Sequence, residues 1–293
     1  MKSNYPTLLR WLRCFFLVIL IVLFALYIGL PVGMAILATY PSKEAVGAPP
    51  EGFIDITLET DDGVTLAGWY APPQNGAVIL LLHGAGGSRE DLRLYANMLS
   101  QHGYGVLALD LRGHGASGGK TNRLGWTGTR DVGAAVVYLQ GQPEVRRMGG
   151  LGISMGGEVL LGAAADYPAL AAIAADGATR RCMEELLALP SERPLVRNFT
   201  ARVMYAAVQV FSGERPPKPL LNEMVAAEST PFLLVSAGAN LLEVEFNQLF
   251  AETVGERVEL WVAPDVGHTA AFNRYPDEYE QRVIAFFDRT LAK

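Results

Sequence analysis

The stretch Gly152-Ile153-Ser154-Met155-Gly156 places a serine between two glycines, each two residues away. It follows a strand-like run and precedes a run of small residues typical of a helix. Small flanking residues let a strand turn abruptly into a helix, and such a turn exposes the serine hydroxyl. A glycine-rich loop that contains a serine by chance has the same pattern. Ser154 is therefore a candidate nucleophile whose assignment depends on finding a base, an acid and an oxyanion hole elsewhere in the chain.

The composition fits one large α/β domain with an apolar appendage. The chain has 293 residues, of which 50% are hydrophobic and 18% are charged, and its formal net charge is −6. No basic block occurs, so nucleic-acid binding has no support. The four histidines are scattered without metal-ligand spacing, and we expect neither a metal nor another cofactor. Cys14 and Cys182 are expected to be free thiols, and the sequence leaves the oligomeric state open.

A long uncharged segment near the N-terminus predicts a membrane helix. Residues 14–38 contain no charged side chain, and about 20 apolar residues span a bilayer as a helix. A cleaved signal peptide has a shorter apolar core, typically about 7–15 residues. A buried helix of a soluble protein is a poor alternative, because this helix would be apolar on every face. We therefore expect an uncleaved, single-pass transmembrane anchor over residues 14–38.

The charges that flank this segment predict its orientation. Lys2, Arg10 and Arg13 precede it, whereas a single lysine follows closely. Basic residues favour the cytoplasmic side of a membrane. Residues 1–13 are therefore expected to form a basic cytoplasmic N-terminus, and the rest of the chain is expected to be extracytoplasmic. Residues 39–50 are interpreted as a linker.

From residue 53 onward, strand-like and helix-like patterns alternate. Residues 53–58 and 64–70 flank the turn Asp61-Asp62-Gly63 and predict a β-hairpin. Residues 77–82 form a continuous apolar run, typical of a central parallel strand that is buried on both faces. Further strands are expected at 105–109, before Ile153, and at 171–175, 232–236 and 258–262. The pattern predicts an α/β fold with a doubly wound, mostly parallel sheet of eight strands.

One long segment interrupts the alternation. More than fifty residues separate the strand ending at Ala175 from the one starting at Phe232, with helical patterns near 181–189 and 198–211. A connection of this length with helices of its own is typical of a functional lid. The alternative is a helix pair that serves only the core. We expect a helical lid insertion over about residues 178–228.

A glycine-rich loop follows the apolar strand directly. In His83-Gly84-Ala85-Gly86-Gly87, the glycines allow backbone N–H groups to point at an anionic oxygen. We expect the backbone N–H groups of Ala85 and Met155 to form an oxyanion hole. His83 itself is expected to be structural rather than a base.

His268 is the candidate general base. It lies in Pro264-Asp265-Val266-Gly267-His268-Thr269, after the last expected strand and before the last helix, from which it could reach Ser154. A surface histidine without a role is the alternative interpretation. His114 is expected to shape its own loop, and Asp110 and Arg112 are expected to pair with each other to fix that loop.

Together these motifs resemble the α/β-hydrolase fold family over about residues 50–291. His83–Gly87 resembles the family's HGxxG loop, Asp110–Gly119 its DxRGHGxSGG loop, and Gly152–Gly156 its nucleophile elbow, while His268 matches its late Gly-His pair. Within that family the chain resembles membrane-anchored, monoacylglycerol-lipase-like and serine-aminopeptidase-like hydrolases. The resemblance implies a Ser–acid–His order along the chain and a hydrolase domain over residues 51–293.

The acid departs from the family pattern. The family usually places Asp in a G-x-x-D motif after the seventh strand, where this chain has Leu241. Glu243 is the first candidate, because its longer side chain could reach the imidazole from two residues further on. Glu245 is the second candidate. Asp176, at the end of the sixth strand, is the third, because some lipases of this fold take their acid from that strand.

The sequence therefore predicts a serine hydrolase that cleaves carboxylic esters, either lipid-like or small acyl esters, with Ser154, His268 and Glu243 as its triad. One alternative is a serine aminopeptidase, which needs a carboxylate pocket for the substrate amine. Glu184, Glu185 and Glu223 are available for it. An alternative of another class is a catalytically inactive, membrane-tethered binding module, supported only by the missing standard aspartate.

Overall fold

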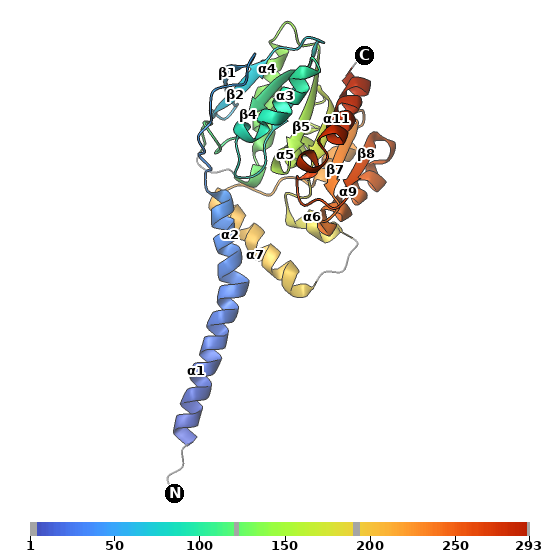
Figure 1. The fold of residues 1–293 in the computed structure, drawn as a ribbon. Coiled ribbons are helices and arrows are strands. Elements are labelled where there is room, and N and C mark those ends of the chain that lie inside the picture. Colours follow the sequence, from blue (N-terminus) through green and yellow to red (C-terminus); the bar gives the residue numbers. More distant parts are fainter. Residues whose placement is uncertain (1–4, 120–122, 190–193, 292–293) are drawn as a thin grey trace. The chain divides into compact units, whose positions relative to one another are not determined.

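The computed structural model describes residues 5–119, 123–189 and 194–291, which fall into two compact units (Figure 1). The larger unit contains the chain from Tyr40 to Leu189 and from Arg215 onward. The smaller unit combines the N-terminal helices, up to Thr39, with the segment that ends at Glu214.

The larger unit is built on one eight-stranded sheet in the order β1-β2-β4-β3-β5-β6-β7-β8. β2 pairs antiparallel with β1 and β4, and every later pairing is parallel. The predicted α/β fold and mostly parallel eight-stranded sheet are therefore confirmed. The strands are β1 Ile54–Glu59, β2 Thr65–Ala71, β3 Ala77–Leu82, β4 Gly105–Leu109, β5 Arg147–Ile153, β6 Leu170–Asp176, β7 Phe232–Ala237 and β8 Val258–Ala263.

Helices lie between the strands along the chain (Figure 1). A capping box opens the 3₁₀ turn Arg89–Leu92 that leads into the first of them: the Ser88 N–H donates to Asp91 Oδ2 at 3.2 Å, and the Ser88 hydroxyl accepts from the Glu90 N–H. The α-helices of this unit are α3 Arg93–Gln101, α4 Gly128–Gln140, α5 Met155–Ala163, α6 Met183–Ala188, α8 Leu220–Ala226, α9 Leu241–Val254, α10 Ala271–Arg274 and α11 Pro276–Leu291. Short 3₁₀ turns lie at Arg89–Leu92, Arg123–Gly125 and Gly255–Arg257.

Small residues in β5 let helices approach the centre of the sheet from both faces. A side chain at Gly149 would meet Phe287 and Leu291 of α11 at 3.0 Å, and one at Gly150 would meet Leu160 of α5 at 3.0 Å. Successive strand residues point to opposite faces, so α11 and α5 cover opposite sides of β5. β5 is therefore packed between α11 and α5. The turn that carries Ser154 comes directly after this strand in the chain.

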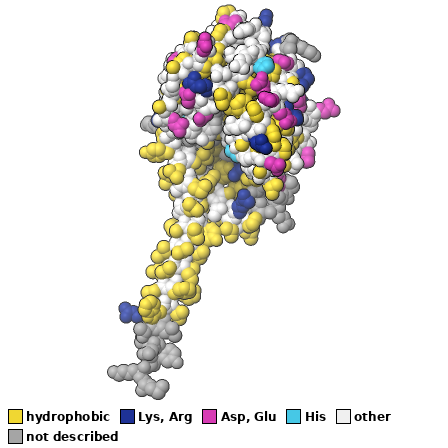
Figure 2. All heavy atoms as spheres, viewed as in Figure 1, with side chains coloured by type: hydrophobic (Ala, Val, Ile, Leu, Met, Phe, Trp, Pro, Cys, Tyr) yellow, Lys and Arg dark blue, Asp and Glu magenta, His cyan; other side chains and the backbone are white. Residues whose placement is uncertain are grey.

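The smaller unit contains one continuous N-terminal helix and α7. The helix runs through α1 Tyr5–Phe24, a π-helical turn Ala25–Gly29 and α2 Leu30–Thr39, and α7 covers Leu195–Ser212. The helix continues through Pro31. The π-helical turn ends two residues before this proline, whose missing N–H removes one of the regular helical hydrogen bonds. Among the described residues, Leu9–Thr39 is the one helix long and apolar enough to cross a membrane, by length and composition. Hydrophobic side chains cover it along its length in Figure 2.

Candidate active site

Ser154 lies on a strained turn between β5 and α5. Its backbone has φ 51° and ψ −116°, a conformation that non-glycine residues rarely adopt. The flanking glycines make this turn possible. A Cβ at Gly152 would lie 2.3 Å from the Gly156 carbonyl carbon, and one at Gly156 would lie 2.3 Å from the Leu82 carbonyl oxygen. No larger residue fits at either position without moving the backbone, so the sequence motif has a direct steric cause.

The structure brings Ser154, His268 and Glu243 together from three separate segments. His268 Nε2 lies 2.8 Å from Ser154 Oγ, and His268 Nδ1 lies 2.7 Å from Glu243 Oε2. An ionised carboxylate can only accept hydrogen bonds, so the Nδ1 proton is donated to Glu243 and Nε2 is left to accept from the serine hydroxyl. This arrangement suits transfer of the serine proton to the imidazole.

Glu243 reaches His268 because it lies in the first turn of α9, directly after β7. Its side chain is fully buried, and Oε1 accepts a hydrogen bond from the Ala237 N–H at 2.6 Å. The Asn240 side chain caps the helix and donates to Oε2 at 3.3 Å. Leu241, at the position of the family's usual aspartate, is 81% exposed. The carboxylate that meets His268 therefore lies two residues further along α9 than Leu241, which is the first residue of that helix.

The other two candidate acids do not make the hydrogen bond that Glu243 makes with His268. Glu245 lies two residues further along α9, a rotation of about 200° around the helix. Asp176 is buried at the end of β6, where its backbone carbonyl accepts from the Ser154 N–H at 2.6 Å. Burial, together with the nearby Glu243 charge, raises the pKa of Asp176 to about 7. Asp176 therefore lies next to the elbow without facing the imidazole as a hydrogen-bond partner.

The charge on Glu243 also sets the protonation of His268. Its hydrogen bond to Nδ1 raises the pKa of His268 above the ordinary value of 6.5, against the opposing effect of partial burial. The pKa is raised because the carboxylate stabilises the imidazolium, which is the form that His268 takes when it accepts a proton.

The glycine-rich loop after β3 lies beside Ser154. Ala85 lines the same cleft as Ser154 and His268, and a Cβ at Gly84 would lie 3.5 Å from Ser154 Cβ. Met155 is the first residue of α5, so its N–H belongs to the helix N-terminus, where backbone donors have no partner within the helix. Ala85 therefore lines the cleft that contains Ser154, and Met155 follows Ser154 at the start of α5.

Two buried histidines fix the glycine-rich loop through hydrogen bonds to backbone N–H groups. His83 Nε2 accepts from the Leu111 N–H at 3.0 Å, and His114 Nε2 accepts from the Gly86 N–H at 3.3 Å. Burial lowers the pKa of each to about 4, so both rings are neutral acceptors at physiological pH. Neither is placed to act as a base on Ser154, in agreement with the structural roles expected for them.

Ser42 is a loop contact that sequence reasoning missed. Its hydroxyl donates to the Gly86 carbonyl at 2.5 Å, and its backbone bonds to both Gly113 and Gly115 at 2.8 Å. Gly86, with φ +81°, is therefore held by its N–H on His114 and by its carbonyl on Ser42. These partners lie far apart in the sequence, and a linker serine carries no local signal for such a contact.

Removal of the Ser42 hydroxyl is expected to loosen the loop next to Ala85. A typical hydrogen bond contributes about 1 kcal/mol, so Ser42→Ala should lower kcat roughly fivefold with little change in KM. Ser42→Thr, which retains the hydroxyl, should restore most of the rate. The measurement is steady-state ester hydrolysis by the full chain. An equal loss in the alanine and threonine variants would contradict a role for this hydrogen bond.

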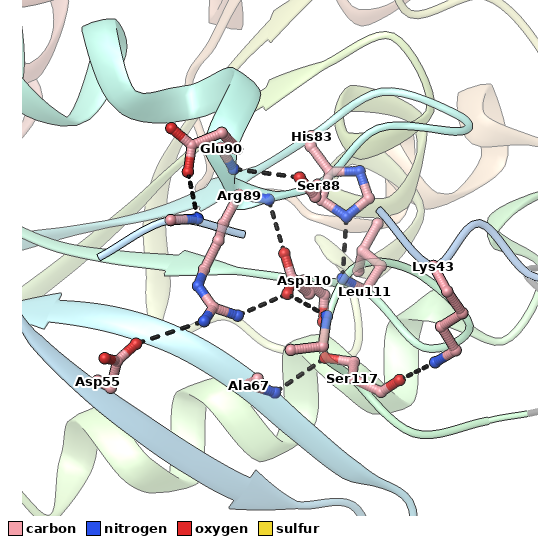
Figure 3. A network of polar contacts seen from close by, with 12 residues as sticks. Lys43, Asp55, Ala67, His83, Ser88, Arg89, Glu90, Asp110, Leu111 and Ser117 are labelled. Atoms are coloured by element: carbon pink, nitrogen blue, oxygen red, sulfur yellow. Dashed lines mark hydrogen bonds and ion pairs between the residues drawn. The ribbon is translucent and has the colours of Figure 1, made fainter. Parts of the chain in front are cut away.

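The expected pairing of Asp110 with Arg112 is wrong. Asp110 instead pairs with Arg89, at 2.5 Å from Nη1, and accepts from the Arg89 N–H at 2.6 Å (Figure 3). Arg112 pairs with Asp131 at 2.7 Å and with Asp62 at 2.8 Å. The two side chains diverge because Asp110 faces the turn that precedes α3, whereas Arg112 faces α4 and the β1–β2 turn. Both pairs still fix the loop after β4.

A cleft of about 530 Å³ opens above Ser154 and His268. One wall is aromatic, where Tyr95 and Phe272 stack with ring centroids 4.5 Å apart. Asp91, an exposed residue, also lines the cleft, and its carboxylate accepts a hydrogen bond from the Ser88 N–H. The cleft is lined by Gly84, Ala85, Gly87, Asp91, Leu92, Leu94, Tyr95, Ile153, Ser154, His268, Thr269, Phe272 and Asn273.

The three carboxylates considered for an aminopeptidase pocket lie elsewhere among the described residues. Glu185 is buried and accepts hydrogen bonds from the N–H groups of Cys182 and Leu220. Glu223 is buried and pairs with Lys218 at 3.2 Å. Glu184 lines a small separate cavity between α6, α8 and α9. None of the three lines the cleft beside Ser154.

The chain belongs to the alpha/beta hydrolase family, whose model matches residues 79–282. It is 27% identical over 239 residues to the uncharacterized protein Rv2307c of Mycobacterium tuberculosis, covering 78% of this chain and 76% of that protein. Among solved structures it is similar to the Pyrococcus furiosus esterase Pf2001, with TM-score 0.71, 28% identity, and coverage of 86% and 98% of the two chains. A membrane phospholipase A described as a novel bacterial virulence factor shares the fold, with TM-score 0.60, 21% identity, and coverage of 97% and 99%.

Proposed function

We propose that this protein is a serine hydrolase that cleaves carboxylic esters. The observation that carries the proposal is the hydrogen-bonded series Ser154–His268–Glu243 at the floor of an open cleft. In the first step, His268 Nε2 takes the hydroxyl proton as Ser154 Oγ attacks the ester carbonyl carbon. The buried carboxylate of Glu243 stabilises the imidazolium that forms.

The remaining steps follow from the same groups. The N–H groups of Ala85 and Met155 would donate to the oxyanion of the tetrahedral intermediate. His268 then returns its proton to the leaving alcohol, and an acyl ester of Ser154 remains. Water, deprotonated by His268, attacks this acyl-enzyme and releases the carboxylic acid with regeneration of the serine hydroxyl.

Substrate class is inferred from the cleft and from a relative. The aromatic wall of Tyr95 and Phe272 favours an apolar acyl or alcohol group. The similar Pyrococcus furiosus protein is an esterase, which supports an ester rather than an amide as the substrate. We therefore assign the protein to lipid-like or small acyl esters.

The alternatives have weaker support. An aminopeptidase would need carboxylates near the scissile bond, but the three considered for that role have other partners or lie at another cavity. The inactive binding module was considered because Leu241 stands where the family usually has its catalytic aspartate. Glu243 occupies the hydrogen-bonding position that the acid requires, which removes the main reason for that interpretation.

We also propose that the N-terminal helix anchors the protein in a membrane as a single-pass span. The supporting observation is the apolar helix Leu9–Thr39. Arg10 and Arg13 at its start favour a cytoplasmic N-terminus and an extracytoplasmic catalytic domain. Esters that partition into a membrane would then be concentrated near the enzyme.

A substrate panel tests the proposed reaction. The detergent-solubilised full chain is expected to hydrolyse p-nitrophenyl esters of graded acyl length with a kcat/KM at least about a hundredfold above that for aminoacyl p-nitroanilides. The chain length with the highest kcat/KM would then define the acyl preference. Faster cleavage of the anilides would favour the aminopeptidase, and no turnover of either class would favour the binding module.

A further inference from the structure

Helix α7 exposes its apolar face. With 3.6 residues per turn, nine of its positions fall within an arc of about 160°, and eight of them are apolar. Six of the nine are exposed, including Phe199 and Val210. The positions on this arc, called the outer face of α7, are Leu195, Val196, Phe199, Thr200, Val203, Ala206, Ala207, Val210 and Phe211.

The opposite side of α7 is the packed side. Tyr205 and Val208 are its buried residues, and α7 packs against α2 within the smaller unit (Figure 1). On α2, the buried residues Pro31, Ala35 and Thr39 are spaced four apart and therefore share one face. An amphipathic helix on a water-soluble domain buries its apolar face. α7 buries Tyr205 and Val208 but leaves most of its apolar outer face exposed, so that face requires an apolar environment.

The position of α2 along the N-terminal helix indicates what that environment is. The 31 residues of Leu9–Thr39 extend about 46 Å at 1.5 Å per residue, longer than the roughly 30 Å hydrocarbon core. If Arg13 lies at the cytoplasmic interface, about 20 residues bring the helix to Gly33 at the other interface. The second half of α2 then lies at the outer headgroup level. Because α7 packs on α2 and also contacts the π-helical turn Ala25–Gly29, it lies at the level of the outer leaflet.

The charges of α7 suit that location. The helix contains no Asp or Glu, and Arg197 and Arg202 are both exposed. Long basic side chains extend from an apolar surface to the polar layer, so both arginines can reach the headgroups from a helix at the interface.

We propose that α7 is an interfacial membrane helix that lies at the outer leaflet with its outer face towards the acyl chains. The occupant of this face is therefore lipid, not a protein partner. This inference rests on the membrane anchoring proposed above and is independent of the catalytic assignment. It would give the insertion after α6 a second attachment to the membrane, in addition to the N-terminal helix.

Spin labels on the full chain test the proposal in vesicles of phosphatidylcholine and phosphatidylglycerol. Cys14→Ser removes the exposed thiol and leaves Cys182, which is buried. Labels are then placed one at a time at Phe199→Cys and Val210→Cys on the outer face. Val137→Cys on α4, which replaces a valine that is 70% exposed, is the matched control in the catalytic unit. Leu20→Cys reports on the N-terminal helix itself.

Relaxation by oxygen, which concentrates in the bilayer, is compared with relaxation by water-soluble nickel chelate. The ratio of oxygen relaxation to nickel relaxation is expected to be at least severalfold higher for the labels at positions 199 and 210 than for the label at 137. It is expected to be highest for the label at position 20. If the label at position 20 has a high oxygen-to-nickel ratio but the labels at 199 and 210 have the same ratio as the label at 137, the proposal of an interfacial helix is overturned and the proposal of an N-terminal anchor stands. If position 20 also matches 137, the anchoring proposal fails. Protection of 199 and 210 from both reagents would mean that protein covers the outer face, which also overturns the inference.

Discussion

Replacement of Ser154 by alanine is expected to abolish ester hydrolysis, with kcat reduced by roughly 10⁴-fold or more. The hydroxyl oxygen is the only atom that the substitution removes, and it is the atom within 2.8 Å of His268 Nε2. Without it no acyl-enzyme forms, and the remaining polar groups can only orient water. The measurement combines steady-state hydrolysis with covalent labelling by a fluorophosphonate probe, which should disappear in Ser154→Ala.

Folding has to be separated from chemistry in this experiment. Alanine has the same Cβ as serine, so the backbone at φ 51° is no more strained in the variant, and thermal unfolding is expected within a few degrees of the parent. Ser100→Ala on α3 is the matched control, because it removes a serine hydroxyl away from the cleft and should keep full labelling. Retained labelling in Ser154→Ala would reject the serine as the nucleophile.

Much of the fold follows from local patterns. β3 is buried at all six positions, and its uninterrupted apolar run indicates a central strand without knowledge of any contact. The hairpin of β1 and β2 was equally predictable, because the alternation of apolar and polar residues and the turn at Gly63 both indicate two antiparallel strands. The helix through Pro31 was harder to predict, since a proline in an apolar helix can either end it or be accommodated by a π-helical turn.

The site was predictable only where the chemistry lies in one short segment. The elbow motif is visible in the sequence because both of its glycines lie within one pentapeptide, although the atom that excludes a side chain at Gly156 is the Leu82 carbonyl oxygen at the end of β3. The partners of Asp110 and the contact of Ser42 with Gly86 join distant segments, and no spacing rule specifies them. The candidate acid is intermediate: a shift of two residues into α9 moves the carboxylate by half a helical turn, and only the packed structure indicates which glutamate meets the imidazole.

Replacement of Glu243 by glutamine should therefore have the second-largest effect, with kcat lowered by roughly 10²- to 10⁴-fold. Glutamine preserves the shape of the side chain but removes the negative charge that faces His268 Nδ1 at 2.7 Å. The imidazolium that forms as Ser154 attacks then has no buried counter-ion. The measurement is kcat for the preferred ester, with circular dichroism to establish that the variant is folded.

Two isosteric substitutions make this test specific to the acid. Glu245→Gln changes a carboxylate on the same helix, and Asp176→Asn changes the buried carboxyl at the end of β6. Both are expected to retain kcat within about tenfold, because neither residue hydrogen-bonds to His268 in the structure. A large loss in Asp176→Asn together with a small one in Glu243→Gln would transfer the role of the acid to β6.

The pH profile distinguishes loss of the charge from general disruption. In the parent, Glu243 raises the pKa of His268 above 6.5, and only the neutral imidazole can accept the serine proton. The value of kcat/KM should therefore rise with pH through that raised pKa. In Glu243→Gln the cause of the increase is gone, so the acidic limb should move to lower pH while the plateau falls. A limb that stays in place in the variant would show that another group sets the pKa of His268, and would contradict Glu243 as its partner.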